Sequence, residues 1–143
     1  MIIDGKRAAD RAIETILAYY SAFNRREFDA MLKLLSDDVA HDPNQAERQI
    51  GRDAFRQFLE RMDGSYAEQI RNIVVTSTPD GKHASAEYVV HGEYKKQDTG
   101  LPPAHGQKYE LPGGAFFTLS RGKITRVTNY YNLHEWIRQV ESA

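Results

Sequence analysis

The hydrophobic period of this 143-residue chain changes once, after Tyr66. Before that point, apolar residues recur at helical spacing in three segments, about 6–24, 27–35 and 52–62. Beyond it they alternate with polar residues, as they do in strands, until a last helical segment at about 133–140. Because helices and strands are segregated along the chain, we expect an α+β fold with helices covering one face of an antiparallel sheet.

The segments expected to be strands are joined by turn sequences rich in glycine and proline. Alternation along the last strand places Val127, Asn129 and Tyr131 on one face of the sheet. The Pro-Gly-Gly motif at 112–114 is expected to interrupt a strand, and Asn132 is expected to cap the C-terminal helix. A strongly twisted sheet with helices on one side curls into a cone, and the mouth of the cone is a natural pocket. The predicted strands cover 39–42, 70–77, 84–94, 107–111, 115–120 and 124–131.

Composition limits the classes of function that fit. The length is typical of one domain, over residues 1–143. A formal net charge of −1 gives no electrostatic footprint for nucleic acid or an anionic membrane. Cysteine is absent and the five histidines lack metal-site spacing, so we expect neither a metal nor another cofactor. The sequence shows neither a signal-peptide pattern nor an apolar run of membrane-spanning length, so we expect a cytoplasmic location.

The stretch from His41 to Gln45 lies between two predicted helices and carries the first candidate for chemistry. Proline biases the residue before it toward extended backbone, so Asp42 should end a short strand. If Asp42 points into the sheet's interior, its carboxylate lies among apolar side chains, where a carboxylate becomes a usable base. Alternation then turns His41 toward the surface or toward a hydrogen bond. The alternative interpretation is that Asp-Pro-Asn is only a turn signal.

Several runs of residues carry a resemblance to a known superfamily. Asp-Asp-Val-Ala-His-Asp-Pro at 37–43, followed by Gly-Arg-Asp-Ala-Phe at 51–55, resembles the ketosteroid isomerase branch of the nuclear transport factor 2-like superfamily. The segment 122–133 resembles the end of SnoaL-like polyketide cyclases, and the runs 41–45, 100–117 and 126–140 resemble a ketosteroid isomerase-related subgroup with no assigned reaction. The resemblance covers nearly the whole chain. It implies a cystatin-like cone: a curved antiparallel sheet with N-terminal helices on its concave face and a short C-terminal helix.

The resemblance also implies roles for particular residues. Asp42 stands where the isomerase has its general base, an aspartate before proline. Tyr19, five residues before Asn24, matches the tyrosine that donates a hydrogen bond to the substrate oxyanion. The second donor of the isomerase, a buried protonated aspartate, is replaced here by Ala115, and one such donor can be worth about 3 kcal/mol of barrier. The alternative is that Asp42 caps or pairs with a neighbouring element and that Tyr19 belongs to the core.

Further polar and aromatic side chains are candidates for contact with a small apolar ligand. The amides could donate to the ligand or hydrogen-bond within their loop, and the aromatic side chains could line a cavity or fill a core. Trp136 could cover the mouth of the cone or only attach the last helix to the sheet. The segment 98–114 could be a lid, a swapped arm or an exposed hairpin. The candidate substrate-binding residues are Asn44, Gln45, Tyr88, Phe117, Asn129, Tyr131 and Trp136.

Three functions fit these patterns. The first is an enzyme of the isomerase, cyclase or dehydratase type that abstracts a proton next to a carbonyl, with Asp42 as base and Tyr19 as oxyanion donor. The second is a non-catalytic pocket for a hydrophobic ligand, which the alanine at position 115 favours. The third is an interaction scaffold that uses the sheet face. Because Phe116 and Phe117 put large side chains on both faces of one strand, we also expect a homodimer through the outer sheet face.

Overall fold

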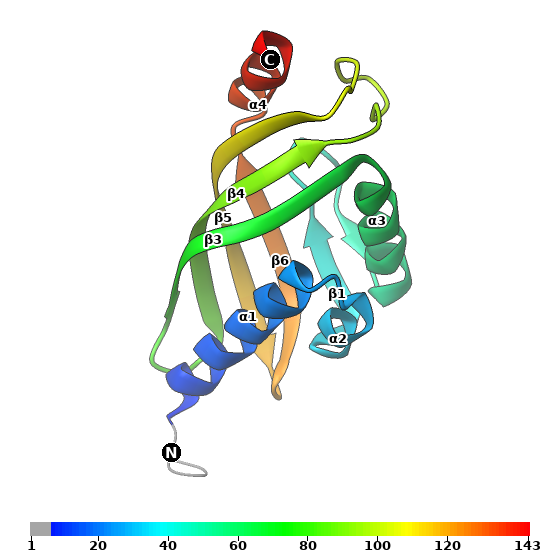
Figure 1. The fold of residues 1–143 in the computed structure, drawn as a ribbon. Helices are drawn as coiled ribbons and strands as arrows, with labels where there is room; N and C mark the ends of the chain where they lie inside the picture. The colour runs from blue at the N-terminus through cyan, green and yellow to red at the C-terminus, as the bar shows by residue number, and fades with distance from the viewer. Residues whose placement is uncertain (1–6) are drawn as a thin grey trace.

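The structure, a computed structural model, describes residues 7–143 and shows a strongly curved sheet with helices in its concavity (Figure 1). The helices at the N-terminal end lie on one side of the sheet, and a short helix closes the chain. The α+β cone expected from the sequence is therefore confirmed. In chain order the elements are α1 (Ala8–Asn24), α2 (Phe28–Lys33), β1 (Leu35–Asp42), β2 (Gln49–Ile50), α3 (Arg52–Ser65), β3 (Tyr66–Ser77), β4 (His83–Tyr94), β5 (Gln107–Ser120), β6 (Lys123–Tyr131) and α4 (Leu133–Ser142).

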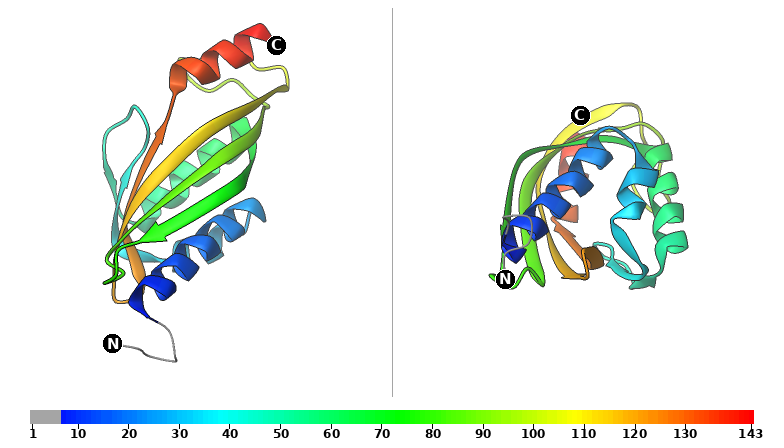
Figure 2. Two further views of the ribbon diagram at one scale, coloured as in Figure 1. Left: turned by 90° about the vertical axis from the view of Figure 1, so that its left-hand side faces the viewer. Right: turned by 90° about the horizontal axis from the view of Figure 1, so that it is seen from below.

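Within the described residues, the six strands form one sheet in the order β2-β1-β6-β5-β4-β3. Neighbouring strands are antiparallel except β1 and β6, which run parallel, so the sheet is mixed where the sequence predicted an antiparallel one. Figure 2 shows the sheet curling around α1 and α3, while α4 lies across one end of the long strands. The curl turns one face of the sheet inward, and this concave face is the surface that positions the candidate site.

Two packed clusters occupy the concave side. The larger cluster joins α1 and α3 to the sheet, and Ile16, Phe55 and Phe117 in it are almost fully buried. The smaller cluster lies under α4, where the ring of Trp136 contacts the ring of Tyr94 at 4.8 Å between centroids. Since each cluster draws side chains from distant parts of the chain, burial of apolar surface holds the curved sheet against its helices.

The ends of several elements differ from the sequence-based expectation. Asn132 does cap α4, because its side-chain oxygen accepts a hydrogen bond from the Glu135 backbone N–H at 3.0 Å. In contrast, Gly64 does not stop α3, which runs three residues past its predicted end and passes directly into β3 at Tyr66. The strand β3 therefore begins four residues earlier than the predicted strand 70–77 and includes residues 66–69. Likewise β1 begins at Leu35, which the helical spacing had assigned to the preceding helix.

The Pro-Gly-Gly motif does not interrupt β5, so that prediction is wrong. The motif lies within the strand, with Gly113 opposite Tyr88 of β4 in register. A Cβ atom on Gly113 would lie 2.9 Å from the Cε1 atom of Tyr88, so the absence of a side chain lets the tyrosine ring pack on the strand. The same device recurs at Gly92, where a Cβ would lie 2.2 Å from the Cζ atom of Tyr109. Glycines thus make room for two tyrosine rings on the concave face.

Candidate functional site

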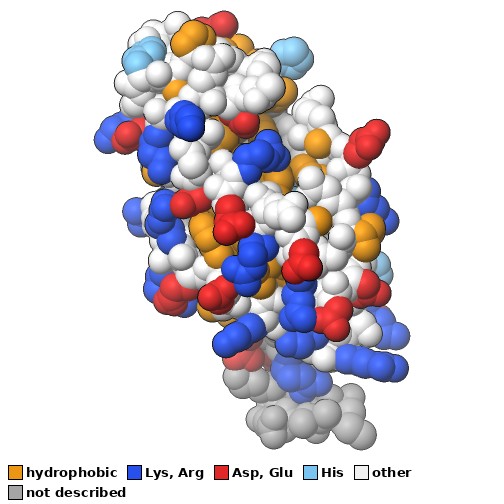
Figure 3. Space-filling model, turned by 90° about the vertical axis from the view of Figure 1, so that its right-hand side faces the viewer, with side chains coloured by type: hydrophobic (Ala, Val, Ile, Leu, Met, Phe, Trp, Pro, Cys, Tyr) orange, Lys and Arg blue, Asp and Glu red, His pale blue; other side chains and the backbone are white. Residues whose placement is uncertain are grey.

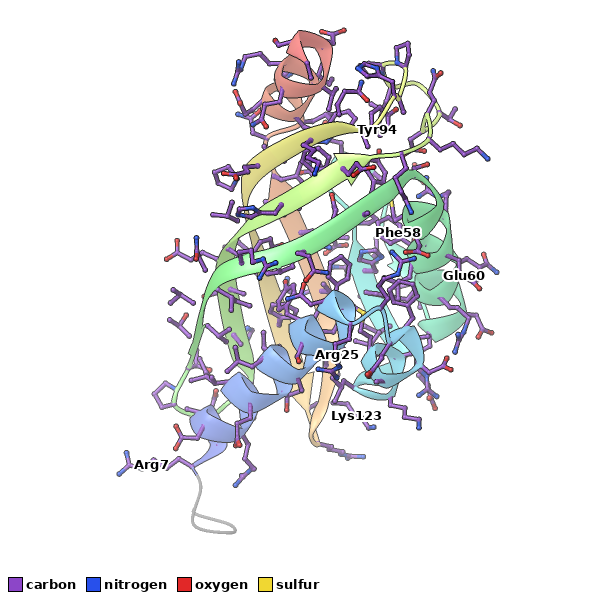
Figure 4. The ribbon with its side chains drawn as sticks, viewed as in Figure 1. Arg7, Arg25, Phe58, Glu60, Tyr94 and Lys123 are labelled. Carbon is purple, nitrogen blue, oxygen red and sulfur yellow. The ribbon has the colours of Figure 1, made fainter. Side chains whose placement is uncertain are left out.

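The two neighbouring residues at the end of β1 lie on opposite faces of the sheet. His41 is 1% exposed, and its ring contacts Phe55 and Phe58 of α3 at 4.4 and 4.6 Å between centroids. Figure 4 shows Phe58 on the side of α3 that faces the sheet, with Glu60 pointing away from it. The expectation that Asp42 points inward and His41 outward is therefore wrong. Val39 is buried on the same face as His41, and strand alternation fixes the direction of both.

Asp42 is held on the outer face by two partners. The Arg48 guanidinium donates to both carboxylate oxygens at 2.7 and 3.0 Å, and the Thr128 hydroxyl donates to Oδ2 at 2.6 Å. The hydrogen bonds from Arg48 are the largest cause that lowers the pKa of Asp42, to about 2. A carboxyl group with such a low pKa is a weak proton acceptor, so this arrangement matches the alternative in which Asp42 pairs with a neighbouring element.

His41 presents a neutral imidazole to the interior. Its Nε2 atom lies 3.4 Å from the side-chain Nδ2 of Asn129 in β6, and because an amide N–H donates, this contact places the ring proton on Nδ1. Among residues 7–143, neither the Nδ1 atom nor Oε1 of Gln49, the residue opposite His41 in β2, makes a hydrogen bond of good geometry, although the Gln49 side chain is close enough to act on the ring. Burial lowers the pKa of His41 to about 4, so the ring is uncharged at neutral pH.

Tyrosines from two elements meet across the cone from His41. Tyr19 and Tyr20 of α1 lie 5.0 Å apart between ring centroids, and Tyr20 lies 5.2 Å from Tyr88 of β4. Burial raises the pKa of all three phenols, so each keeps its proton and serves as a hydrogen-bond donor. The Phe55 ring lies against both Tyr19, at 6.5 Å, and His41, which puts the two residues in one region of the interior.

Two tyrosines on the concave face keep some exposed surface, although burial raises the pKa of both. Tyr131 is 39% exposed, yet burial is the largest cause of its raised pKa. Tyr88 is only partly buried by surface area, and burial is again the main cause of its raised pKa. Both tyrosines lie on the concave face of the sheet, where Gly113 of β5 is opposite each of them in register. This part of the concave face is where we place the candidate site.

The remaining candidate residues divide between core and loop positions. Phe117 and Trp136 are 0% and 4% exposed and pack in the two clusters, as the core alternative expected. Asn44 donates its side-chain amide to the backbone carbonyl of Tyr131 at 2.9 Å, so it joins its loop to β6. Gln45 is exposed and has a positive φ of 64°, which is a turn conformation. Ala115 is buried on the concave face and offers no polar group.

Hydrogen bonds from neighbouring strand residues hold the segment between β4 and β5 in place. The Tyr94 hydroxyl donates to the backbone carbonyl of Pro102 at 2.6 Å, and the Tyr66 hydroxyl donates to Asp98 at 2.9 Å. Gln107 donates to the Pro103 carbonyl at 2.9 Å. The loop therefore packs beside the smaller cluster, and β5 takes up the residues from 107 onward.

The outer surface carries two hollows and charges of both signs. A hollow of about 530 Å³ lies on the outer sheet face beside Gln139 of α4, and one of about 340 Å³ lies near Phe116 and Arg126. Neither is lined by Asp42 or Tyr19. Figure 3 shows basic and acidic side chains interspersed over α3. In the described part of the chain, no helix is long and apolar enough to cross a bilayer, and no group of three or more His, Asp or Glu could hold a metal.

Sequence reasoning missed two ionisable groups of the concave face, His41 and Glu68. The signal for His41 was Val39, since an apolar residue two positions away shares its face. The signal for Glu68 was its alternation with Tyr66 and Ile70, both buried, in a segment that had not been assigned to a strand.

Comparison with known proteins places the chain in a family. The model of the SnoaL-like domain matches residues 16–127. The chain belongs to the SnoaL-like family. Its fold is that of the nuclear transport factor 2-like superfamily, so the resemblance noted in the sequence is confirmed. No curated protein matches this SnoaL-like chain.

Solved structures share the SnoaL-like fold at different degrees of identity. A "putative polyketide cyclase" from Xanthomonas campestris pv. campestris is 60% identical with a TM-score of 0.91, over 93% of this chain and 98% of that one. Another from Pseudomonas putida KT2440 is 53% identical with a TM-score of 0.89, over 90% and 97%. A "putative ketosteroid isomerase" from Kribbella flavida is 20% identical with a TM-score of 0.63, over 88% and 81%, and this likeness shows the fold alone.

Proposed function

We propose that this SnoaL-like protein is an enzyme that moves a proton at a carbon next to a carbonyl group of an apolar small molecule, inside the cone. The observation that carries the proposal is His41, a buried neutral imidazole that contacts the Phe55 ring, which in turn contacts Tyr19, a phenol that keeps its proton and can donate it in a hydrogen bond. A base and a hydrogen-bond donor within one apolar site are what enolisation needs. The similar structures named putative polyketide cyclase, at 60% and 53% identity, support the same class of chemistry.

Each residue has a defined part in the proposed step. The ligand first displaces the Asn129 amide from Nε2 of His41. The C–H bond next to the carbonyl then breaks, its proton passes to Nε2, and its electron pair forms the enolate. The hydroxyl of Tyr19 donates a hydrogen bond to the enolate oxygen, and return of the proton to another carbon completes an isomerisation. Phe55 and Phe58 keep water from the imidazole, which strengthens both interactions.

The sequence-based assignment, with Asp42 as the base, is the competing version of this mechanism. It requires Asp42 to leave Arg48 and Thr128 and to reach the other face of the sheet, so the geometry favours His41. In both versions Tyr19 is the oxyanion donor, and no cofactor takes part.

The proposal is tested by proton exchange, which needs no knowledge of the natural product. Apolar methyl ketones, among them 2-acetylnaphthalene, are incubated with the protein in D₂O, and deuterium uptake next to the carbonyl is followed by NMR. We expect uptake well above that in buffer or with heat-denatured protein. Uptake at the buffer rate for every ketone would contradict enzymatic enolisation.

A non-catalytic hydrophobic binding protein is the second candidate function. Two observations favour it: Ala115 offers no second oxyanion donor, and the low pKa of His41 makes the imidazole a modest base. Native mass spectrometry of freshly purified protein separates the two functions. A stoichiometric ligand that is recovered unchanged after incubation supports binding, whereas its conversion supports catalysis.

A further inference from the structure

A second polar position lies on the concave face, away from His41. Glu68 of β3 lies opposite Gly92 of β4, and Gly92 lies opposite Tyr109 of β5. The Tyr109 ring crosses the space that a side chain at position 92 would fill, and its hydroxyl donates a short hydrogen bond to Oε2 of Glu68. Three strands therefore build this contact, and it depends on a glycine between the two partners.

The other oxygen of the Glu68 carboxyl is unused. Within residues 7–143, the bond from Tyr109 is the only hydrogen bond of this carboxyl, and no Lys or Arg pairs with it. Burial is the largest cause that raises its pKa, and the bond from Tyr109 opposes that change. A desolvated carboxyl group without a cation destabilises a fold, which is the usual signature of a group kept for binding or catalysis.

Glu68 lies on the same concave face as two tyrosines that solvent can reach. Strand register puts Glu68 opposite Gly92, and Tyr88 and Tyr131 both opposite Gly113, on that face. Glu68 itself is only partly buried by surface area. A ligand in the cone can therefore reach it.

One helix connects this position to His41. Phe58 of α3 contacts the His41 ring, and Met62 packs against the cluster that contains Tyr109. Four residues of helix rise about 6 Å, so the helix positions that contact the His41 ring and the smaller cluster lie about one turn apart.

We propose that Glu68 is the second polar contact of the interior site and binds a hydroxyl group at the far end of an apolar ligand whose carbonyl lies near His41. A hydroxyl fits because it can donate to a carboxylate and accept from a carboxylic acid. The inference rests on the proposed function for the position of the carbonyl end. It narrows the substrate class to hydroxylated aromatic or polycyclic carbonyl compounds.

A matched pair of probes tests the inference. These are 6-hydroxy-2-acetylnaphthalene, which carries a hydroxyl and a carbonyl at opposite ends, and 2-acetylnaphthalene, which lacks the hydroxyl. Binding of each is measured by fluorescence or NMR titration, with thermal melting as a check on folding. We expect the wild-type protein to bind the hydroxylated probe at least about tenfold more tightly, as a hydrogen bond to a carboxyl group provides.

Two variants test whether the preference for the hydroxylated probe depends on the Glu68 carboxyl oxygen that Tyr109 does not bind. Glu68→Leu should bind both probes with equal affinity. Its melting temperature is compared with that of Tyr109→Phe, because both variants lose the hydrogen bond between these two residues. Tyr109→Phe keeps Glu68 and should keep the preference. Equal binding of the two probes by the wild-type protein, no binding of the hydroxylated probe, or an undiminished preference in Glu68→Leu would overturn the inference.

Failure of the Glu68 inference can be distinguished from failure of the proposed function, because binding and deuterium uptake are measured separately. Hydroxyl preference without deuterium uptake supports the Glu68 contact and contradicts enolisation. Deuterium uptake without hydroxyl preference supports enolisation and contradicts the role of Glu68.

Discussion

His41 and Asp42 are adjacent in the chain, yet their side chains end on opposite sides of the sheet. The imidazole lies against Phe55 in the interior, and the carboxylate lies between Arg48 and Thr128 on the outer face. The residue that a sequence comparison assigns as a base is thus a structural anion, and its neighbour holds the interior position.

Replacement of Asp42 by Asn should weaken the fold and leave the interior unchanged. The pKa of Asp42 falls from 3.8 in the unfolded chain to about 2 in the fold, so its stabilising contribution is present above pH 4 and is lost as the pH falls toward 2. Because the side chain is 25% exposed, we discount the full value and expect a loss of about 1 kcal/mol in the free energy of unfolding at pH 7. Urea denaturation at pH 7 and pH 3 measures this, and a variant as stable as the wild-type protein at pH 7 would contradict it.

Stability should also depend on His41 in mildly acidic solution. Its pKa is 6.5 in the unfolded chain and about 4 in the fold, so the unfolded state binds a proton first as the pH falls. Stability is thus retained above pH 6.5 and is lost between pH 6.5 and 4, by about 2 kcal/mol from pH 7 to pH 5. The His41→Leu variant lacks this contribution and is the control. An equal loss in both proteins between pH 7 and pH 5 would show that other groups cause it.

A side chain at Gly92 should disturb the Tyr109 ring. The added Cβ of Gly92→Ala would overlap the ring, so we expect destabilisation by about 1–3 kcal/mol and loss of the bond to Glu68. Gly64→Ala is the matched control, because nothing lies within 4 Å of its added Cβ and the position is helical. The control should be neutral or stabilising by up to about 1 kcal/mol. Thermal denaturation of both variants measures the difference, and similar melting temperatures would argue against the packing described.

The outer sheet face should form a homodimer. Phe116 and Tyr130 are 51% and 57% exposed there, with ring centroids 5.9 Å apart. Exposed aromatic pairs on a sheet face are typical of protein–protein contacts. Light scattering should give a dimer at micromolar concentration for the wild-type protein and a monomer for Phe116→Lys. Leu17→Lys, an exposed position on α1, should remain a dimer. A monomeric wild-type protein would contradict this prediction.

Much of this architecture follows from local sequence signals. Helical spacing located α1 and α3, the cap at Asn132 located α4, and alternation gave the two faces of β6, with Val127 buried and Tyr130 exposed. The helical spacing and the strand alternation succeeded because each is a period repeated over many residues, and the cap succeeded because it is a local side-chain–backbone hydrogen bond.

The site could not be derived in the same way. The proline after Asp42 suggested where β1 ends but not which way its side chains point, and the direction follows from Val39 and the partners on β6. Glu68 lies where α3 passes straight into β3, so no turn signal marked the strand's start. The pairing of Tyr109 with Glu68 across Gly92 depends on strand register, which a sequence does not contain.

The central claim, that His41 and not Asp42 takes the proton, is tested most directly by comparing His41→Gln with Asp42→Asn. Deuterium uptake into 6-hydroxy-2-acetylnaphthalene is measured at pH 7 for both variants and for the wild-type protein, at a temperature where all three are folded. We predict that His41→Gln slows uptake by about 100-fold or more, as loss of a general base does, while Asp42→Asn stays within a few-fold of the wild-type rate. Loss of uptake in Asp42→Asn together with a normal rate in His41→Gln would contradict the account.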